Sequence, residues 1–284
     1  MQFSALITSF SIFACFTSTS VNSYTTPSMN IQTLVPNNIP QTDKDTKSAI
    51  NNDHGKQLLV PKPSVLFFDC DDCLYFNNWK LADRLTSKIE EWSLAHGLQP
   101  GEAYELYKEY GTALRGMISK DYIEDSPEAI DEYLEAVHDI PIHEYLSKDD
   151  KLRQVLLSMD PTIPKYVFTA SVRAHAERCL HALGIEDLFV DIIDVKSCGF
   201  VTKHSREAFE AAMRIASVND PERCLFLDDS VKNLKMAKEM GWRGILVGRK
   251  ARDTGEIITC DDAENEIDCI YDLASILPKL FKAS

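Results

Sequence analysis

The sequence predicts an α/β fold: a parallel sheet flanked by helices, with an all-helical segment inserted after the first strand. Short runs of β-forming residues alternate with helical patterns across residues 160–284, and this alternation is typical of a parallel sheet covered by helices. Residues 78–159 show helical spacing alone and separate the first strand from the others. The chain has 284 residues, of which 44% are hydrophobic, so it is long enough to bury a sizeable core.

The first predicted strand, residues 64–68, reads Ser-Val-Leu-Phe-Phe and is followed directly by carboxylates. A short apolar run of this kind predicts a strand that is buried on both faces of a parallel sheet. Asp69 and Asp71 follow its carboxyl end, and ligands of open α/β sheets bind beyond the carboxyl ends of the strands. This strand therefore predicts where a functional site lies.

The insertion begins with an amphipathic helix that is expected to end at His96-Gly97. Its apolar residues share one helix face: Trp79, Leu81, Leu85, Ile89 and Trp92. A second helix is predicted over 103–117 and a third over 127–137, which begins with a proline as helices often do. Because no strand pattern interrupts these helices, residues 78–159 are expected to form a helical cap.

The rest of the chain completes the predicted core. Strands are expected at 165–169, 191–195, 224–227 and 244–247, and the last of these completes the series. Helices are expected between them at 173–183, 206–216 and 231–240. The prediction is a Rossmann-like catalytic core made of residues 62–77 and 160–284.

The N-terminal residues read as a targeting segment. Residues 1–23 combine an apolar stretch with small residues at a suitable cleavage position, and residues 24–61 are polar enough to predict a disordered presequence or linker. An apolar signal before a hydroxyl-rich tract resembles the presequences of plastids that are reached through the secretory route. We therefore expect plastid import, with a cytoplasmic location as the alternative and no membrane attachment after processing.

Composition narrows the classes of partner and compartment. The formal net charge is -14, from 44 acidic and 30 basic side chains, and this balance repels a nucleic-acid polymer. A small phosphorylated metabolite stays compatible if a metal ion and local cations line its pocket. The eight cysteines do not show the spacing of a disulfide scaffold or of a zinc site, so a reducing compartment is expected. The sequence leaves the oligomeric state open.

Polar residues that suit phosphate chemistry follow several of the predicted strands. They are Asp69, Asp71, Thr169, Ser171, Asp228 and Asp229, with Lys203 between the third strand and its helix. Carboxylates that converge on one point raise one another's pKa unless a cation holds them. Mg²⁺ is the usual cation at phosphate sites, so the pattern predicts a Mg²⁺-assisted phosphoryl-transfer site.

These motifs together resemble the haloacid dehalogenase superfamily. Its first motif resembles Asp69-Cys70-Asp71-Asp72-Cys73, in which Cys73 stands at a position where threonine is usual. Thr169 resembles the second motif, Lys203 the third, and Asp228-Asp229-Ser230 with Asn233 the fourth. Within the superfamily, residues 73–75 and 107–116 are similar to the pyrimidine 5′-nucleotidase group of fungi and plants.

The resemblance implies a role for each residue. Asp69 would attack phosphorus and form an aspartyl-phosphate, and Asp71 would act as acid and then base. Thr169 and Lys203 would stabilise the phosphoryl oxygens. Mg²⁺ would be held by Asp69, Asp228 and the backbone carbonyl of Asp71, while Asp229 and Asn233 would support the metal or Lys203. Tyr75, Arg115 and Ser171 are candidate substrate contacts.

The resemblance also implies a substrate, a pyrimidine nucleoside 5′-monophosphate. The alternatives are another small monophosphate and a sugar-phosphate mutase reaction, which would use the same motifs. Dehalogenation is disfavoured because it needs neither the Asp71 carboxyl nor a metal. A non-catalytic interaction module is disfavoured by the intact set of motif residues.

Overall fold

The computed structural model describes residues 62–252 and 254–281. The expected targeting segment 1–23 and the expected presequence or linker 24–61 lie outside these residues, so the expected location stays a prediction. In the described part of the chain, every helix is too short or too polar to cross a bilayer.

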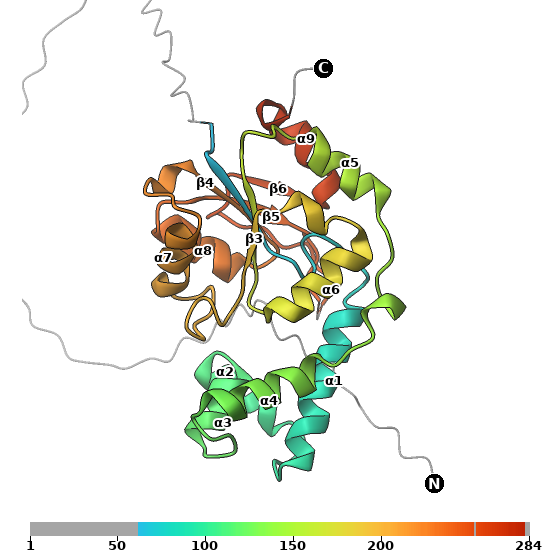
Figure 1. The fold of residues 1–284 in the computed structure, drawn as a ribbon, viewed down its shortest axis with the longest axis vertical. Coiled ribbons are helices and arrows are strands. Elements are labelled where there is room, and N and C mark those ends of the chain that lie inside the picture. Colours follow the sequence, from blue (N-terminus) through green and yellow to red (C-terminus); the bar gives the residue numbers. More distant parts are fainter. Residues whose placement is uncertain (1–61, 253, 282–284) are drawn as a thin grey trace, which may run out of the picture. The chain divides into compact units, whose positions relative to one another are not determined.

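A six-stranded parallel sheet in the order β3-β2-β1-β4-β5-β6 forms the centre of the fold (Figure 1). Its strands are β1 (Val65–Phe68), β2 (Lys165–Phe168), β3 (Asp191–Ile193), β4 (Cys224–Asp228), β5 (Arg243–Val247) and β6 (Asn265–Ile267). The predicted fold class is confirmed. β6 is an addition to the expected series, because its three residues are mostly polar and give no strand pattern.

Helices cover both faces of this sheet. On one side lie α5 (Asp150–Ser158), α6 (Arg173–Leu183) and α9 (Leu273–Ile276), and on the other α7 (Arg206–Ile215) and α8 (Val231–Glu239) (Figure 1). β1 alternates between them: Leu66 and Phe68 join the cluster that includes α6, while Val65 and Phe67 join the cluster that includes α7. The apolar run of β1 is thus buried on both faces, as its sequence predicts.

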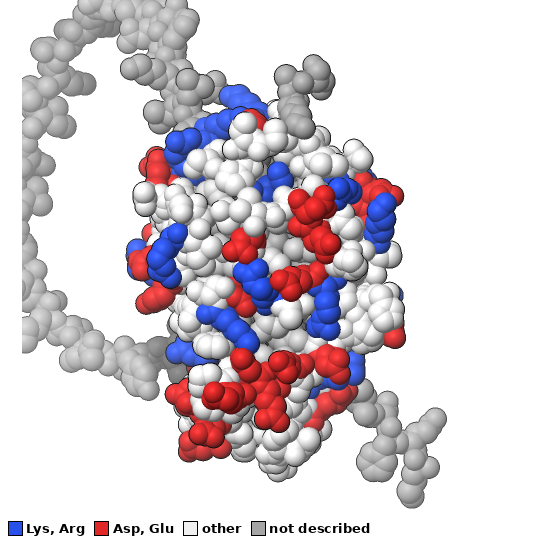
Figure 2. Space-filling model, in the orientation of Figure 1, with Lys and Arg blue, Asp and Glu red and all other residues white. Residues whose placement is uncertain are grey.

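Five α-helices lie between β1 and β2, and four of them lie apart from the sheet in Figure 1. They are α1 (Lys80–Ala95), α2 (Glu102–Tyr110), α3 (Ala113–Ser119) and α4 (Pro127–His138). They pack on one another through a cluster that includes Leu106, Met117 and Leu134. Acidic side chains gather over this part of the surface in Figure 2. The fifth helix, α5, falls within the predicted cap of residues 78–159 but packs on the sheet.

The single helix expected over 103–117 is wrong, because the chain folds back there into α2 and α3. Gly111 adopts a left-handed conformation with φ of 84°, which favours glycine, and ends α2. The Thr112 side chain then caps α3 by accepting a hydrogen bond from the Arg115 amide. Gly116 lets the two helices approach closely, since a Cβ there would lie 2.5 Å from Leu106 Cβ.

Candidate active site

The ends of three adjacent strands bring the predicted site residues together. β1, β2 and β4 run parallel, so the segments that follow Phe68, Phe168 and Leu227 meet at one edge of the sheet. They line a pocket with an empty volume of about 490 Å³. Its lining includes Asp69, Asp71, Asp72, Thr169, Ala170, His175, Lys203 and Asp229.

A buried lysine joins two of the predicted carboxylates. Lys203 Nζ lies 2.7 Å from Asp69 Oδ1 and 2.7 Å from Asp228 Oδ2. It also donates to the Phe168 carbonyl oxygen at 3.2 Å. All three charged side chains are buried. The lysine therefore holds the predicted nucleophile and the predicted metal ligand in fixed positions.

Asp228 is fixed from its other side by the start of α8. Its carboxylate accepts hydrogen bonds from the Ser230 amide at 2.8 Å and from Asn233 Nδ2 at 2.9 and 3.1 Å. Asn233 thus supports this carboxylate. Lys203 is oriented by Asp69 and Asp228, while Asp229 lies within the carboxylate cluster beside them.

The carboxylate cluster has the chemistry of a metal site. Oxygen atoms of Asp69, Asp228 and Asp229 lie within 4.8 Å of one another. Burial raises the pKa of Asp69 to about 8, with Lys203 opposing and Asp228 adding to the rise. Burial, with the charges of Asp228 and Asp69, also raises the pKa of Asp229. Buried carboxylates that repel one another are stabilised by a further cation. Because their ligand atoms are oxygens, they suit a hard divalent ion.

Asp71 occupies a different environment, although it lies two residues from Asp69. Its Oδ1 accepts hydrogen bonds from Tyr75 Oη at 2.5 Å and from His175 Nε2 at 2.8 Å. Its Oδ2 accepts one from Ser171 Oγ at 3.3 Å. Burial by itself would raise the pKa of Asp71, but the His175 charge and the hydrogen bonds from His175 and Tyr75 lower it below its usual range. Three donors from separate segments therefore fix this carboxylate.

His175 is a site residue that sequence reasoning missed. Burial would lower its pKa, but Asp71 reverses the effect and raises the pKa of His175 to about 10. The ring of His138 lies 5.4 Å from that of His175, and burial and the His175 charge lower the pKa of His138 to about 4. The sequence contains a weak signal, because His175 falls in the first turn of the helix that follows Ser171. A solvated histidine would give the same pattern.

The remaining predicted residues take varied positions. Thr169 is buried at the end of β2 and lines the pocket, and its Oγ1 accepts a hydrogen bond from the Ser171 amide at 3.0 Å. Tyr75 packs in the core beside Asp71 and does not line the pocket. Arg115 is exposed on α3 and lines neither this pocket nor the one beside it.

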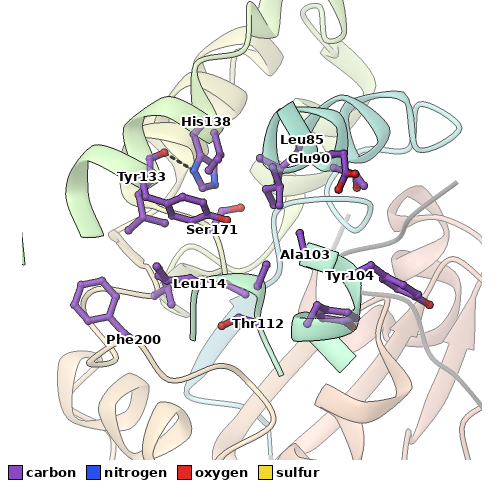
Figure 3. Close-up of a pocket in the computed structure, with 18 residues that line it drawn as sticks. Leu85, Glu90, Ala103, Tyr104, Thr112, Leu114, Tyr133, His138, Ser171 and Phe200 are labelled. Atoms are coloured by element: carbon purple, nitrogen blue, oxygen red, sulfur yellow. Dashed lines mark hydrogen bonds between the residues drawn. The ribbon is translucent and has the colours of Figure 1, made fainter. Parts of the chain in front are cut away.

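A second, larger pocket of about 910 Å³ lies between the inserted helices and the segment after β2. Leu85 and Ala170 line both pockets, so the two adjoin. Figure 3 shows Tyr133 and His138 from α4 surrounding this space together with Leu85 of α1 and Ser171. We call it the cap pocket. Its described lining contains Glu90 as a charged residue and neither lysine nor arginine.

Residues 63–241 match the profile of the haloacid dehalogenase-like hydrolases. The chain belongs to this family. The match includes every residue described above for the two pockets and most of the sheet. The predicted resemblance to the superfamily is therefore confirmed, and the narrower resemblance to pyrimidine 5′-nucleotidases stays a prediction.

One curated relative and two solved structures are similar to this chain. Phosphate metabolism protein 8 of Saccharomyces cerevisiae is 31% identical over 202 residues, which are 64% of this chain and 60% of the yeast protein. β-Phosphoglucomutase of Clostridium difficile has a TM-score of 0.55 at 17% identity, over 77% of this chain and 97% of that chain. CbbY of Rhodobacter sphaeroides, solved with phosphate, has a TM-score of 0.55 at 20% identity, over 74% and 96%. At these identities the solved structures show the fold alone.

Proposed function

We propose that this hydrolase is a Mg²⁺-dependent phosphatase that acts on a small monophosphate through an aspartyl-phosphate on Asp69. The observation that carries the proposal is the buried contact of 2.7 Å between Asp69 and Lys203 at the end of the central strand. A carboxylate nucleophile beside a fixed cation suits phosphoryl transfer, which depends on positioning and on neutralised charge.

The first half of the reaction would form the covalent intermediate. Asp69 attacks phosphorus in line with the leaving oxygen, and the bond from phosphorus to that oxygen breaks. Thr169 and Lys203 line the pocket beside Asp69 and would hold the equatorial phosphoryl oxygens. Asp71 passes a proton from His175 to the leaving oxygen, which departs as an alcohol.

The second half would release phosphate. The Asp71 carboxylate takes a proton from a water molecule that attacks the aspartyl-phosphate and returns it to His175, and inorganic phosphate leaves. His175 supports both halves, because it keeps a proton within 2.8 Å of the Asp71 carboxylate. The pair can therefore store the proton that the leaving oxygen needs.

The donor set fits the predicted metal ion. Asp69, Asp228 and the backbone carbonyl of Asp71 would hold Mg²⁺, with Asp229 beside them. When bound, the ion neutralises negative charge on the transferring phosphoryl group.

The cap pocket supports a substrate whose organic part is uncharged. Aromatic residues line it, including Tyr104, Tyr107, Tyr133 and Phe200. Its one described carboxylate, Glu90, accepts a hydrogen bond from the Gly101 amide at 2.8 Å. A second phosphate would find no lysine or arginine among the described lining residues, which disfavours a sugar bisphosphate intermediate and hence a mutase. A pyrimidine nucleoside fits this neutral aromatic lining, so a pyrimidine nucleoside 5′-monophosphate is the substrate we propose.

A phosphate-release assay tests the proposal. The full chain is given UMP, CMP, glucose 6-phosphate and β-glucose 1-phosphate, with Mg²⁺ or with EDTA, and products are followed by chromatography. We expect Mg²⁺-dependent release from UMP and CMP, and a loss of at least about 10³-fold in Asp69→Asn. Asp261→Asn removes the same charge from an exposed position and should keep wild-type activity.

The possible outcomes distinguish an error in the proposed mechanism from an error in the proposed substrate. Activity that persists in EDTA or in Asp69→Asn would contradict the mechanism. Release from another monophosphate but not from UMP or CMP would contradict only the substrate. Conversion of β-glucose 1-phosphate to glucose 6-phosphate without phosphate release would identify a mutase.

A further inference from the structure

A buried pair of cysteines, Cys70 and Cys179, lies next to the Asp71 carboxylate. Cys70 stands between Asp69 and Asp71, and Cys179 lies on α6 one turn after His175. Residues four apart on a helix project from the same face, and Cys179 Sγ contacts His175 Nε2 there. Both thiols are fully buried. The proposed hydrolysis uses neither of them.

The side-chain atoms of this cluster are close enough to share one ion. One ligand atom each from Cys70, Asp71 and Cys179 lie within 4.8 Å of one another. Cys179 Sγ lies 3.5 Å from His175 Nε2, and His175 Nε2 lies 2.8 Å from Asp71 Oδ1. Two sulfurs and one carboxylate oxygen thus lie around one small volume, and the imidazole nitrogen of His175 lies next to two of these three atoms.

We propose that Cys70, Asp71, His175 and Cys179 form a binding site for Zn²⁺, and that Zn²⁺ bound there inhibits the hydrolase. Two cysteines, a histidine and a carboxylate are all ligands that Zn²⁺ accepts in tetrahedral geometry. In such a site, bonds of about 2.3 Å to sulfur and about 2.1 Å to nitrogen place those two atoms about 3.6 Å apart. The observed separation of Cys179 Sγ and His175 Nε2 is 3.5 Å.

A Zn²⁺ ion can reach this site, and its charge can be balanced there. Asp71 and His175 line the pocket at the strand ends, which we call the catalytic pocket, so an ion can reach the cluster from there. Binding would release the two thiol protons and any proton on His175 Nε2, leaving thiolates, a neutral imidazole and a carboxylate around the ion. The sulfur ligands select Zn²⁺ over Mg²⁺, which the oxygen ligands of Asp69, Asp228 and Asp229 favour instead.

Zn²⁺ would inhibit the hydrolase because it takes Asp71 as a ligand. The inhibition, unlike the binding of Zn²⁺, rests on the proposed function. A carboxylate that binds Zn²⁺ can neither protonate the leaving oxygen nor activate water. The two ions would use different atoms of Asp71, its carboxylate for Zn²⁺ and its backbone carbonyl for Mg²⁺, so excess Mg²⁺ should not displace the inhibitor.

Co²⁺ serves as a spectroscopic probe for the site, independent of any activity. Full-length reduced protein in excess Mg²⁺ is titrated with Co²⁺, and near-ultraviolet sulfur-to-cobalt charge transfer is recorded. We expect one equivalent of Co²⁺ to produce this absorption and Zn²⁺ to abolish it. Cys70→Ser and Cys179→Ser should each weaken Co²⁺ binding at least about tenfold, since even indirect changes around a metal site cost that much.

A matched variant and an activity assay complete the test. Cys224→Ser changes a buried cysteine at the opposite end of β4 and should bind Co²⁺ like the wild type. For each protein, the Zn²⁺ concentration that halves its own Mg²⁺-supported rate is measured, and it should rise at least about tenfold in Cys179→Ser.

The outcomes are distinct. The absence of charge transfer in the wild type, or its persistence in both site variants, would overturn the Zn²⁺ site. If Co²⁺ binds as expected but no phosphatase activity exists to inhibit, the proposed function fails and the metal site stands.

Discussion

The two adjoining pockets of this hydrolase differ sharply in charge. The catalytic pocket concentrates Asp69, Asp71, Lys203 and Asp229 around strand ends, whereas the cap pocket is lined by apolar and aromatic side chains with Glu90 as its charged residue. They meet only at small or apolar residues such as Leu85 and Ala170. The comparison suggests that one pocket performs the chemistry and the other selects the leaving group.

The difference follows from how each pocket is built. Parallel strands end at one edge of the sheet, so polar residues in three distant segments are forced together there. The cap pocket is lined instead by the inner faces of α1 to α4, which must be apolar to pack. Changes in the charged pocket should therefore cost more than changes in the neutral one.

The largest effect is expected from Lys203→Met. The substitution removes the cation between Asp69 and Asp228 and leaves two buried carboxylates facing each other. We expect the free energy of unfolding in EDTA to fall by about 3–5 kcal/mol, as when one partner of a buried ion pair is lost. Mg²⁺ should restore part of the loss, because it binds the folded cluster. Urea unfolding with and without Mg²⁺ measures both.

Lys196→Met provides the control for Lys203→Met. Lys196 pairs with Asp131 at 2.5 Å, but both side chains are largely exposed. Its loss should change the free energy of unfolding by less than about 1 kcal/mol. Equal destabilisation by the two substitutions would show that the buried ion pairs of Lys203 contribute no more to the free energy of unfolding than an exposed ion pair does.

A smaller effect is expected from His175→Phe, which removes a hydrogen-bond donor from Asp71. If His175 positions the acid, turnover of UMP should fall about 10²-fold, the usual contribution of acid-base catalysis. Turnover of p-nitrophenyl phosphate should fall much less, because its leaving group departs without a proton. His175→Gln keeps an N–H donor and should recover part of the loss.

His181→Phe is the matched control on the same helix. His181 is exposed and contacts Glu186, so both substrates should be turned over at wild-type rates. Equal losses on the two substrates in His175→Phe would point to a general structural role for this histidine.

The sequence was sufficient for the core because its signals are local. The helix expected over 173–183 coincides with α6, Arg173–Leu183, since apolar periodicity and Gly184 mark its extent. The site residues at the strand ends could also be predicted, since strand order alone brings Asp69, Thr169 and Asp228 together. Only the fold class and the superfamily are confirmed; the roles of these residues stay proposals.

Other features depend on contacts that no local pattern records. β6 depends on pairing with β5. The break at Gly111 is different, because a glycine followed by a capping threonine marks it locally. His175 becomes part of the site only through a hydrogen bond to a residue 104 positions earlier. Arg115 was expected near the substrate, but the turn of α3 leaves it exposed.

The smallest effect is expected in the cap pocket, where two neighbouring residues lead to opposite predictions. Leu114 lines the pocket, whereas Arg115 is exposed on the same helix. Leu114→Ala should lower kcat/KM for UMP about tenfold, mainly through KM, because it removes apolar contact with the leaving group. Arg115→Ala should change kcat/KM by less than about twofold. A larger loss in Arg115→Ala would mean that α3 turns toward the substrate when it binds, and that a positive charge then enters the pocket that this structure leaves neutral.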